Sequence, residues 1–190
     1  MNGQIDKRGC EFTEIRFGGS GGQGVILMGV ILATSAVLDG CRVVQTQSYG
    51  PEARGGYSRS DVIISGGVID YPQLQGADIL VTLSLEAALR YLPMLRDDGY
   101  LIYDSVEIPN PPRDGGKQHG FPFSRLAQEH VGRPQTANVL TLGAVAELTG
   151  VVSLGSLEAA VESVAPAGTS QVNRQALEVG ARAARGELES

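Results

Sequence analysis

The sequence predicts a single-domain α/β protein with an open, mostly parallel β-sheet flanked by helices. Two observations lead to this prediction. Short apolar runs of strand length alternate with segments of helical periodicity, and a glycine-rich stretch lies between the first strand and the first helix, as in βαβ units. Beyond Ser124 the chain is expected to be helical. Its 190 residues suit one domain, which we place at 12–185, after an N-terminal tail at 1–11.

The first unit is a strand, a glycine-rich loop and a helix. Residues 14–17 are predicted to end the strand, the loop follows, and the helix runs over 25–39 before Gly40. Residues 42–45 form the second strand, which the βαβ rule makes parallel to the first. The side of the helix predicted to face the sheet follows helical spacing and contains Val25, Met28, Gly29, Leu32, Ala33 and Ala36.

The middle of the chain supplies the other strands. Gly66-Gly67 is predicted to be a hairpin turn, and Asp98-Gly99 a turn after a helix that Ser84 caps. The apolar face of that helix is predicted from Leu85, Ala88, Leu89 and Leu92. The strands are expected at 58–65, 68–70, 79–83, 100–103 and 119–121. The C-terminal helices are expected at 124–131, 137–148, 156–164 and 172–185.

Composition excludes several classes of protein. A net charge of −6 and a pI near 4.9 argue against nucleic-acid binding. The longest apolar run, residues 25–38, is too short to cross a bilayer. Cys10 and Cys41 are far apart in sequence and form no C-x-x-C, so we expect no iron–sulfur cluster and no metal site from this chain alone. These features predict a cytoplasmic protein with reduced cysteines.

The first glycine-rich loop is the first candidate binding site. Five glycines in seven positions leave backbone N–H groups open to an anion or a partner's carbonyl, and Gln23 carries an amide suited to donation. The loop matches G-x-G-x-x-G, but residues 44–47 contain no acid to bind a ribose, which counts against a dinucleotide. The alternative is that the glycines only allow close packing of helix on sheet. The candidate residues are Gly19, Ser20, Gly21, Gly22, Gln23 and Gly24.

A second loop is predicted at the same edge of the sheet, because it follows the second strand. Arg54 is expected to contact an anion or a partner, whereas Arg59 is expected to pair with an acid such as Asp61. The candidate residues are Ser48, Tyr49, Gly50, Pro51, Glu52, Arg54, Gly55 and Gly56. Asp104, His119 and His130 are interpreted as structural or surface residues, and no catalytic set is apparent.

At these two loops the chain resembles the gamma subunit, or gamma domain, of 2-oxoacid:ferredoxin oxidoreductases. The matching sequence segments are GSGGQGV at 19–25 and SYGPEARGG at 48–56. Shorter matches extend the likeness over about 12–185, where the family's gamma-type domain is then expected. Gly66-Gly67 stands where an acidic turn is usual in the family, and Leu85 stands where glutamine is usual.

The resemblance implies a non-catalytic subunit of an enzyme that converts a 2-oxoacid to an acyl-coenzyme A. Arrangement within the family favours 2-oxoglutarate, but pyruvate, branched-chain and aryl-pyruvate substrates stay open, because their enzymes share these segments. Thiamine diphosphate, Mg²⁺ and iron–sulfur clusters would lie on alpha and beta subunits, with a ferredoxin-like delta subunit as a further candidate. The two loops would contact those partners or coenzyme A. Two other hypotheses stay open: a stand-alone dinucleotide-dependent enzyme, and a small anion-binding module. Co-purification with larger, iron-containing subunits would distinguish the first from the others.

Overall fold

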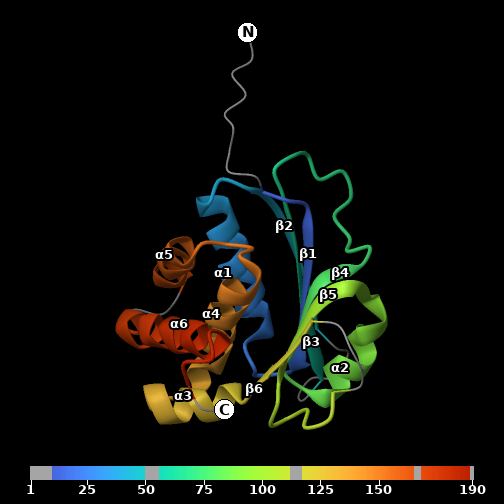
Figure 1. Cartoon of the computed structure of the whole chain (residues 1–190). Helices are drawn as coiled ribbons and strands as arrows, with labels where there is room; N and C mark the ends of the chain where they lie inside the picture. The colour runs from blue at the N-terminus through green and yellow to red at the C-terminus, as the bar shows by residue number, and fades with distance from the viewer. Residues whose placement is uncertain (1–9, 50–55, 112–116, 165–167, 189–190) are drawn as a thin grey trace.

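The computed structural model describes residues 10–49, 56–111, 117–164 and 168–188. A six-stranded sheet in the order β2-β3-β1-β4-β5-β6 forms its centre (Figure 1). Every pair of neighbouring strands is parallel except those that include β3, so the predicted mostly parallel sheet is confirmed. The strands are β1 Thr13–Ser20, β2 Arg42–Tyr49, β3 Tyr57–Ser65, β4 Ala77–Thr82, β5 Leu95–Asp104 and β6 Lys117–Phe121.

Helices cover the two faces of this sheet unequally. One face carries a thick layer of α1, α3, α4, α5 and α6, and the other carries α2 with the short η1 (Figure 1). The helical segments are α1 Val25–Leu38, α2 Leu85–Tyr91, η1 Leu92–Met94, α3 Phe123–Val131, η2 Pro134–Thr136, α4 Ala137–Thr149, α5 Leu154–Val164 and α6 Ser170–Ala184. None of the helices in the described ranges is long and apolar enough to cross a membrane.

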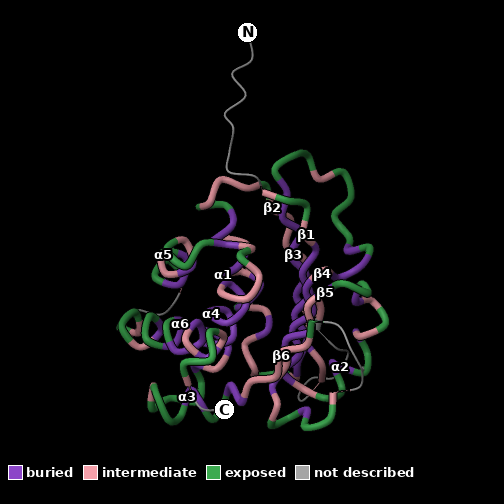
Figure 2. The backbone as a smooth tube through the Cα atoms, in the orientation of Figure 1, coloured by how far each residue is buried: buried purple, intermediate pink, exposed green. Residues whose placement is uncertain are grey.

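The large apolar core lies between the sheet and the thick layer of helices (Figure 2). The predicted inner face of α1 is mostly confirmed, and Ile31 and Ser35 are buried with it. Helices α4 and α6 cross closely at Gly143 and Gly180, where a Cβ would meet the backbone of the other helix. The core of this domain is therefore built jointly by β1, α1, β3 and β4 of the N-terminal half and by the C-terminal helices.

β1 and β2 are parallel, as predicted, but they are not neighbours. β3 lies between them and is antiparallel to both, with Val62 opposite Ile15 of β1 and Gln45 of β2. β2 and β3 are thus an antiparallel pair, and the end of β2 and the start of β3 lie beside the carboxyl end of β1.

Two turn predictions were wrong. No strand occurs at 68–70, because the chain leaves the sheet after Ser65: the Gly66 N–H donates to the Cys10 carbonyl at 2.9 Å, and the Gly67 N–H donates to the Ser65 hydroxyl at 3.0 Å. Asp98-Gly99 lies inside β5 instead of in a turn. A Cβ at Gly99 would stand 2.9 Å from the Asp78 carbonyl oxygen, so glycine allows β5 to approach β4 closely there.

The predicted apolar face of α2 is also wrong in part. Ala87, Ala88 and Tyr91 are buried, whereas Leu85 and Leu89 remain 45% and 58% exposed. Tyr91 fills the small space between α2 and the sheet, which leaves both leucines outside.

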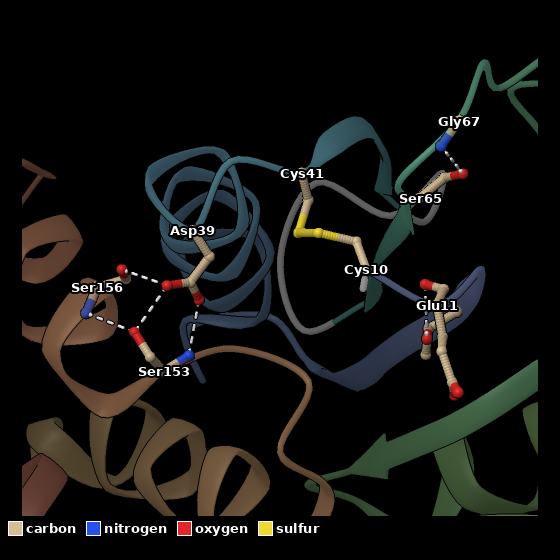
Figure 3. The surroundings of a disulfide bond; sticks show 9 residues. Cys10, Glu11, Asp39, Cys41, Ser65, Gly67, Ser153 and Ser156 are labelled. Atoms are coloured by element: carbon tan, nitrogen blue, oxygen red, sulfur yellow. Dashed lines mark hydrogen bonds between the residues drawn. A yellow bond between two sulfur atoms is a disulfide. The ribbon is translucent and has the colours of Figure 1, made fainter. Parts of the chain in front are cut away.

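The cysteines are not reduced, contrary to the prediction. Cys10 and Cys41 form a disulfide with a Cα–Cα distance of 5.9 Å (Figure 3). Helix α1 returns the chain to the edge where β1 begins, and this brings together two residues 31 apart in sequence. Closing a loop of that length stabilises the fold by about 3–4 kcal/mol in the chain-entropy account. Residues 1–9 of the predicted tail lie outside the described residues.

Candidate functional site

The first glycine-rich loop is shorter than predicted, because β1 continues through Ser20. Gly18 and Gly19 are buried strand residues. A Cβ at Gly18 would stand 2.7 Å from the Tyr91 ring, and one at Gly19 would stand 2.6 Å from the Gln23 side-chain oxygen. The packing alternative therefore accounts for both of these glycines.

The remaining loop is held by Gln23. Its side-chain oxygen accepts from the Ser20 N–H at 2.7 Å, and its amide nitrogen donates to the Leu83 carbonyl at 2.8 Å. The amide that we predicted as a donor to a ligand is thus engaged within the chain, joining the end of β1 to the end of β4.

Gly22 and Gly24 have φ values of 93° and 73°, which side chains of L-residues rarely adopt. Gly24 is pressed against Asn138 of α4. A Cβ at Gly22, in contrast, would meet no atom within 4 Å. Gly21 and Gly22 are exposed, so these two are the part of the loop that another molecule can reach.

The described end of the second loop lies beside the first loop. The Gly21 N–H donates to the Gly56 carbonyl at 2.8 Å, and Ser20 lies opposite Tyr57 in the ladder between β1 and β3. Ser48 and Tyr49 belong to β2 and not to the loop. Gly50, Pro51, Glu52, Arg54 and Gly55 lie outside the described residues.

Helix α1 begins at this junction. Its N-cap, Gly24, has no side chain to bond the first N–H groups, and its first turn contains no acid. The unpaired N–H groups and the positive end of the helix dipole therefore favour a negative group nearby. This local electrostatic preference agrees with the predicted anion or carbonyl contact.

A cavity of about 250 Å³ lies beside the loop. Gly22, Gln23, Asp104, Ser124 and Asn138 are among its lining residues. Sequence reasoning treated Asp104 as structural and did not connect it with the loop. Its position as the last residue of β5 was the available signal, because the carboxyl ends of parallel strands share one edge.

Asp104 is buried, with 3% of its surface exposed. Burial raises the pKa of its carboxyl, while backbone N–H donors on Val106, Glu107 and Ser124 act in the opposite direction. The Val106 N–H lies 2.9 Å from Oδ1. The site therefore contains an acid whose proton is held more tightly than usual, in a cavity that the exposed Gly22 also lines.

The other predicted residues behave as expected for structural groups. Arg59 lies 3.5 Å from Asp61, so the predicted ion pair is present. His119 stacks on Tyr100 with ring centres 6.0 Å apart, and burial lowers the pKa of its imidazole. His130 is exposed at the end of α3.

Another cavity lies at the opposite edge of the sheet. It has a volume of about 800 Å³ and is lined by the disulfide, the Phe12–Thr13 backbone region and the turn around Gly150. Asp39 there accepts from the Ser153 N–H and hydroxyl, each at 2.7 Å, which ties α1 to the start of α5 (Figure 3). Within the described ranges no group of three His, Cys, Asp or Glu residues could hold a metal ion.

Known proteins resemble this chain over most of its length. The family model described as pyruvate ferredoxin/flavodoxin oxidoreductase matches residues 14–183. A 2-oxoglutarate synthase subunit KorC from Methanothermobacter marburgensis is 46% identical over 174 residues, which are 88% of this chain and 94% of that subunit.

A solved structure and a longer polypeptide also resemble this chain. The crystal structure of a keto/oxoacid ferredoxin oxidoreductase gamma subunit from Geobacter sulfurreducens superposes with a TM-score of 0.82 at 43% identity, covering 92% of this chain and 99% of that one. The ketoisovalerate oxidoreductase subunit VorA of M. marburgensis is 34% identical over 140 residues, which are 73% of this chain but only 29% of VorA.

Proposed function

We propose that this chain, which belongs to the pyruvate ferredoxin/flavodoxin oxidoreductase family, is the gamma-type subunit of a 2-oxoglutarate:ferredoxin oxidoreductase. The complex would convert 2-oxoglutarate, coenzyme A and two oxidised ferredoxins to succinyl-coenzyme A, CO₂, a proton and two reduced ferredoxins. The supporting observation is the 46% identity to a 2-oxoglutarate synthase subunit along nearly its whole length.

The chain's own contribution is structural and positional. Both cysteines are joined to each other, so neither is available as a cluster ligand, and the clusters, thiamine diphosphate and Mg²⁺ are assigned to alpha, beta and ferredoxin-like subunits. The match to less than a third of VorA supports this division. In VorA a region like this chain is joined to other regions, so the subunit contacts proposed for this chain would correspond to contacts within VorA. A cytoplasmic location belongs to the same proposal.

The glycine loops are proposed as the part of the chain nearest to the reaction. Gly21 and Gly22 are exposed, and the uncapped start of α1 favours an anion beside them. A phosphate of coenzyme A or a backbone carbonyl of a partner subunit satisfies these N–H groups equally well. Arg54, on the second loop, would add a charged contact.

Reconstitution tests the function. The chain is co-expressed with the candidate alpha, beta and delta subunits and purified through a tag on this chain alone. We expect a brown complex that reduces ferredoxin fastest with 2-oxoglutarate among a panel that includes pyruvate and 2-oxoisovalerate. Recovery of the chain alone, or a complex that prefers another 2-oxoacid, contradicts the proposal or its substrate respectively.

Substitution of Gly22 by valine tests the role of the loop. The φ of 93° makes a β-branched side chain unfavourable, and that side chain would project into open space towards any bound group. Gly132→Val is a matched control, because Gly132 has a φ of 74° and an equally open Cβ position at the end of α3. We expect the activity of the complex to fall only for Gly22→Val. If the Gly22→Val and Gly132→Val complexes are equally active, the loop only connects β1 to α1 and contacts no ligand or partner.

Arg54→Ala distinguishes the two ligands proposed for the loops. If Arg54 contacts a coenzyme A phosphate, losing a charge-assisted hydrogen bond raises the Michaelis constant for coenzyme A about ten- to a hundredfold. The constant for the 2-oxoacid then stays unchanged, and Arg54→Lys recovers only part of the loss. Dissociation of the complex on gel filtration would instead assign Arg54 to a subunit contact.

A further inference from the structure

Helix α2 presents an apolar pair to solvent. Leu85 and Leu89 lie one turn apart on its outer side and are 45% and 58% exposed. The space between α2 and the sheet is occupied by Tyr91, whose ring lies where a side chain on Gly18 would stand. Because Tyr91 packs between α2 and the sheet, the two leucines stay on the solvent side of the helix, although they give this helix its apolar periodicity.

Arg90 follows Leu89 on the exposed side of α2, next to a group of further arginines. The Arg90 guanidinium carbon lies 4.0 Å from the centre of the Tyr57 ring, and that of Arg16 lies 5.0 Å from the Tyr91 ring. Arg59 stands two residues after Tyr57, on the same face of β3. Arg16 and Arg59 share Asp61 as an ion-pair partner, so these two guanidinium groups lie close together.

Positive charge exceeds negative charge in this cluster. Asp61 accepts two hydrogen bonds of 2.7 Å from Arg16 and also lies 3.5 Å from Arg59, so one carboxylate serves two guanidinium groups. Arg90 has no carboxylate partner among the residues that the structure describes; Glu86, one turn earlier on α2, does not pair with it. Arg16, Arg59 and Arg90 thus face two carboxylates, Asp61 and Glu86, which leaves one excess positive charge here in a chain with a net charge of −6.

We propose that this α2 surface, formed by Tyr57, Arg59, Leu85, Leu89 and Arg90, is where another subunit of the oxidoreductase docks. The inference rests on the proposed function. The partner surface presents carboxylates to the arginines and apolar side chains to the two exposed leucines, and arginine and tyrosine are enriched at protein interfaces. It adjoins the glycine loops, because Tyr57 follows Gly56 directly and lies opposite Ser20.

The chemistry of the surface argues against two other occupants. In a symmetric dimer the same surface would face itself, and its excess positive charges would repel each other. A nucleotide phosphate would use the arginines but leave both leucines in water. A partner with carboxylates and apolar groups can pair with the arginines and cover the two leucines and Tyr57 at the same time.

Two substitutions test the proposal, each with a matched control. Arg90→Glu reverses one charge and is compared with Arg125→Glu on α3, where Arg125 is also exposed. Leu89→Asp is compared with Val37→Asp at the end of α1, where Val37 is likewise 58% exposed. The dissociation constant of each variant from the remaining subunits is measured at low and high salt, after circular dichroism and thermal unfolding have confirmed a native fold.

We expect Arg90→Glu and Leu89→Asp to weaken assembly at least tenfold, while both controls stay within twofold of the wild type. The Arg90→Glu complex should also lose part of its salt dependence. Unchanged dissociation constants for Arg90→Glu and Leu89→Asp overturn the docking site, and so does a raised Michaelis constant for coenzyme A in a fully assembled complex. Self-association lost only in these variants would overturn it in favour of a homodimer. Failure of the wild-type chain to assemble refutes the proposed function instead.

Discussion

The two faces of the sheet are built from different chemistry. The face beneath α1 and α3–α6 is apolar, with Ile15 and Phe17 of β1 fully buried in the large core. The opposite face, beneath α2, buries charged residues from the same strand: Glu14 and Arg16 are only 1% and 4% exposed. Alternate residues of one strand therefore enter an apolar core on one side and an ion-pair network on the other.

The apolar residues on the helical face stabilise the monomer, whereas the buried charges on the α2 face have another role. Apolar burial on the helical face stabilises the fold directly. A buried ion pair adds little net stability, because removing its charges from water offsets most of the attraction. The Arg16–Asp61 pair on the α2 face is thus better explained by the arrangement it holds, which includes Tyr91 and the proposed docking surface.

The largest expected effect comes from breaking that pair. Asp61→Ala leaves the Arg16 guanidinium buried without its two 2.7 Å hydrogen bonds, and we expect a loss of about 3–5 kcal/mol in the free energy of unfolding. Urea denaturation measures it. The double variant Arg16→Met, Asp61→Leu should recover most of the loss. If the double variant is as unstable as Asp61→Ala alone, the pair itself stabilises the monomer and the two faces do not differ as described.

A smaller loss is expected on the helical face from Gly180→Val. A side chain at Gly180 would collide with the Leu140 carbonyl of α4, so α4 and α6 must separate, at a cost of about 3 kcal/mol. Gly155→Val is the control, because a Cβ at Gly155 of α5 meets no atom within 4 Å. Thermal unfolding of both variants measures the difference. Similar melting temperatures would mean that the α4–α6 contact yields easily, and that this face is less rigid than its packing indicates.

Local signals made many elements predictable. The hydroxyl of Ser84 accepts from the Ala87 N–H at 3.3 Å, as its capping position indicated. Gly150 ends α4 with a φ of 64°. The periodicity of residues 25–39 located α1 to within one residue. Each of these predictions depends on interactions between residues close in sequence, which the sequence displays directly.

Features that depend on distant residues could not be predicted in the same way. The insertion of β3 between β1 and β2, the disulfide, and the proximity of Asp104 to the glycine loop all require the chain to return from elsewhere. Glycine content was also ambiguous, because Gly18 is needed for packing against Tyr91 whereas Gly22 is exposed. Only the neighbours in the fold distinguish the two.

The smallest expected effect concerns Asp104, the buried carboxylate that breaks the pattern of an apolar helical face. Since burial raises its pKa in the folded state, folding favours the protonated form. Its contribution is therefore most favourable below the unfolded pKa of about 3.9, and stability is lost as the pH rises from there through the folded pKa.

Asp104→Asn keeps an acceptor for the Val106 N–H but cannot ionise. We expect the variant to match the wild type near pH 3.9 and to be more stable at neutral pH, by an amount that stops growing above the folded pKa. Urea denaturation at a series of pH values checks this. A variant that is less stable than the wild type at neutral pH would show that the N–H donors outweigh burial, and that the carboxylate at this edge is held in its charged form.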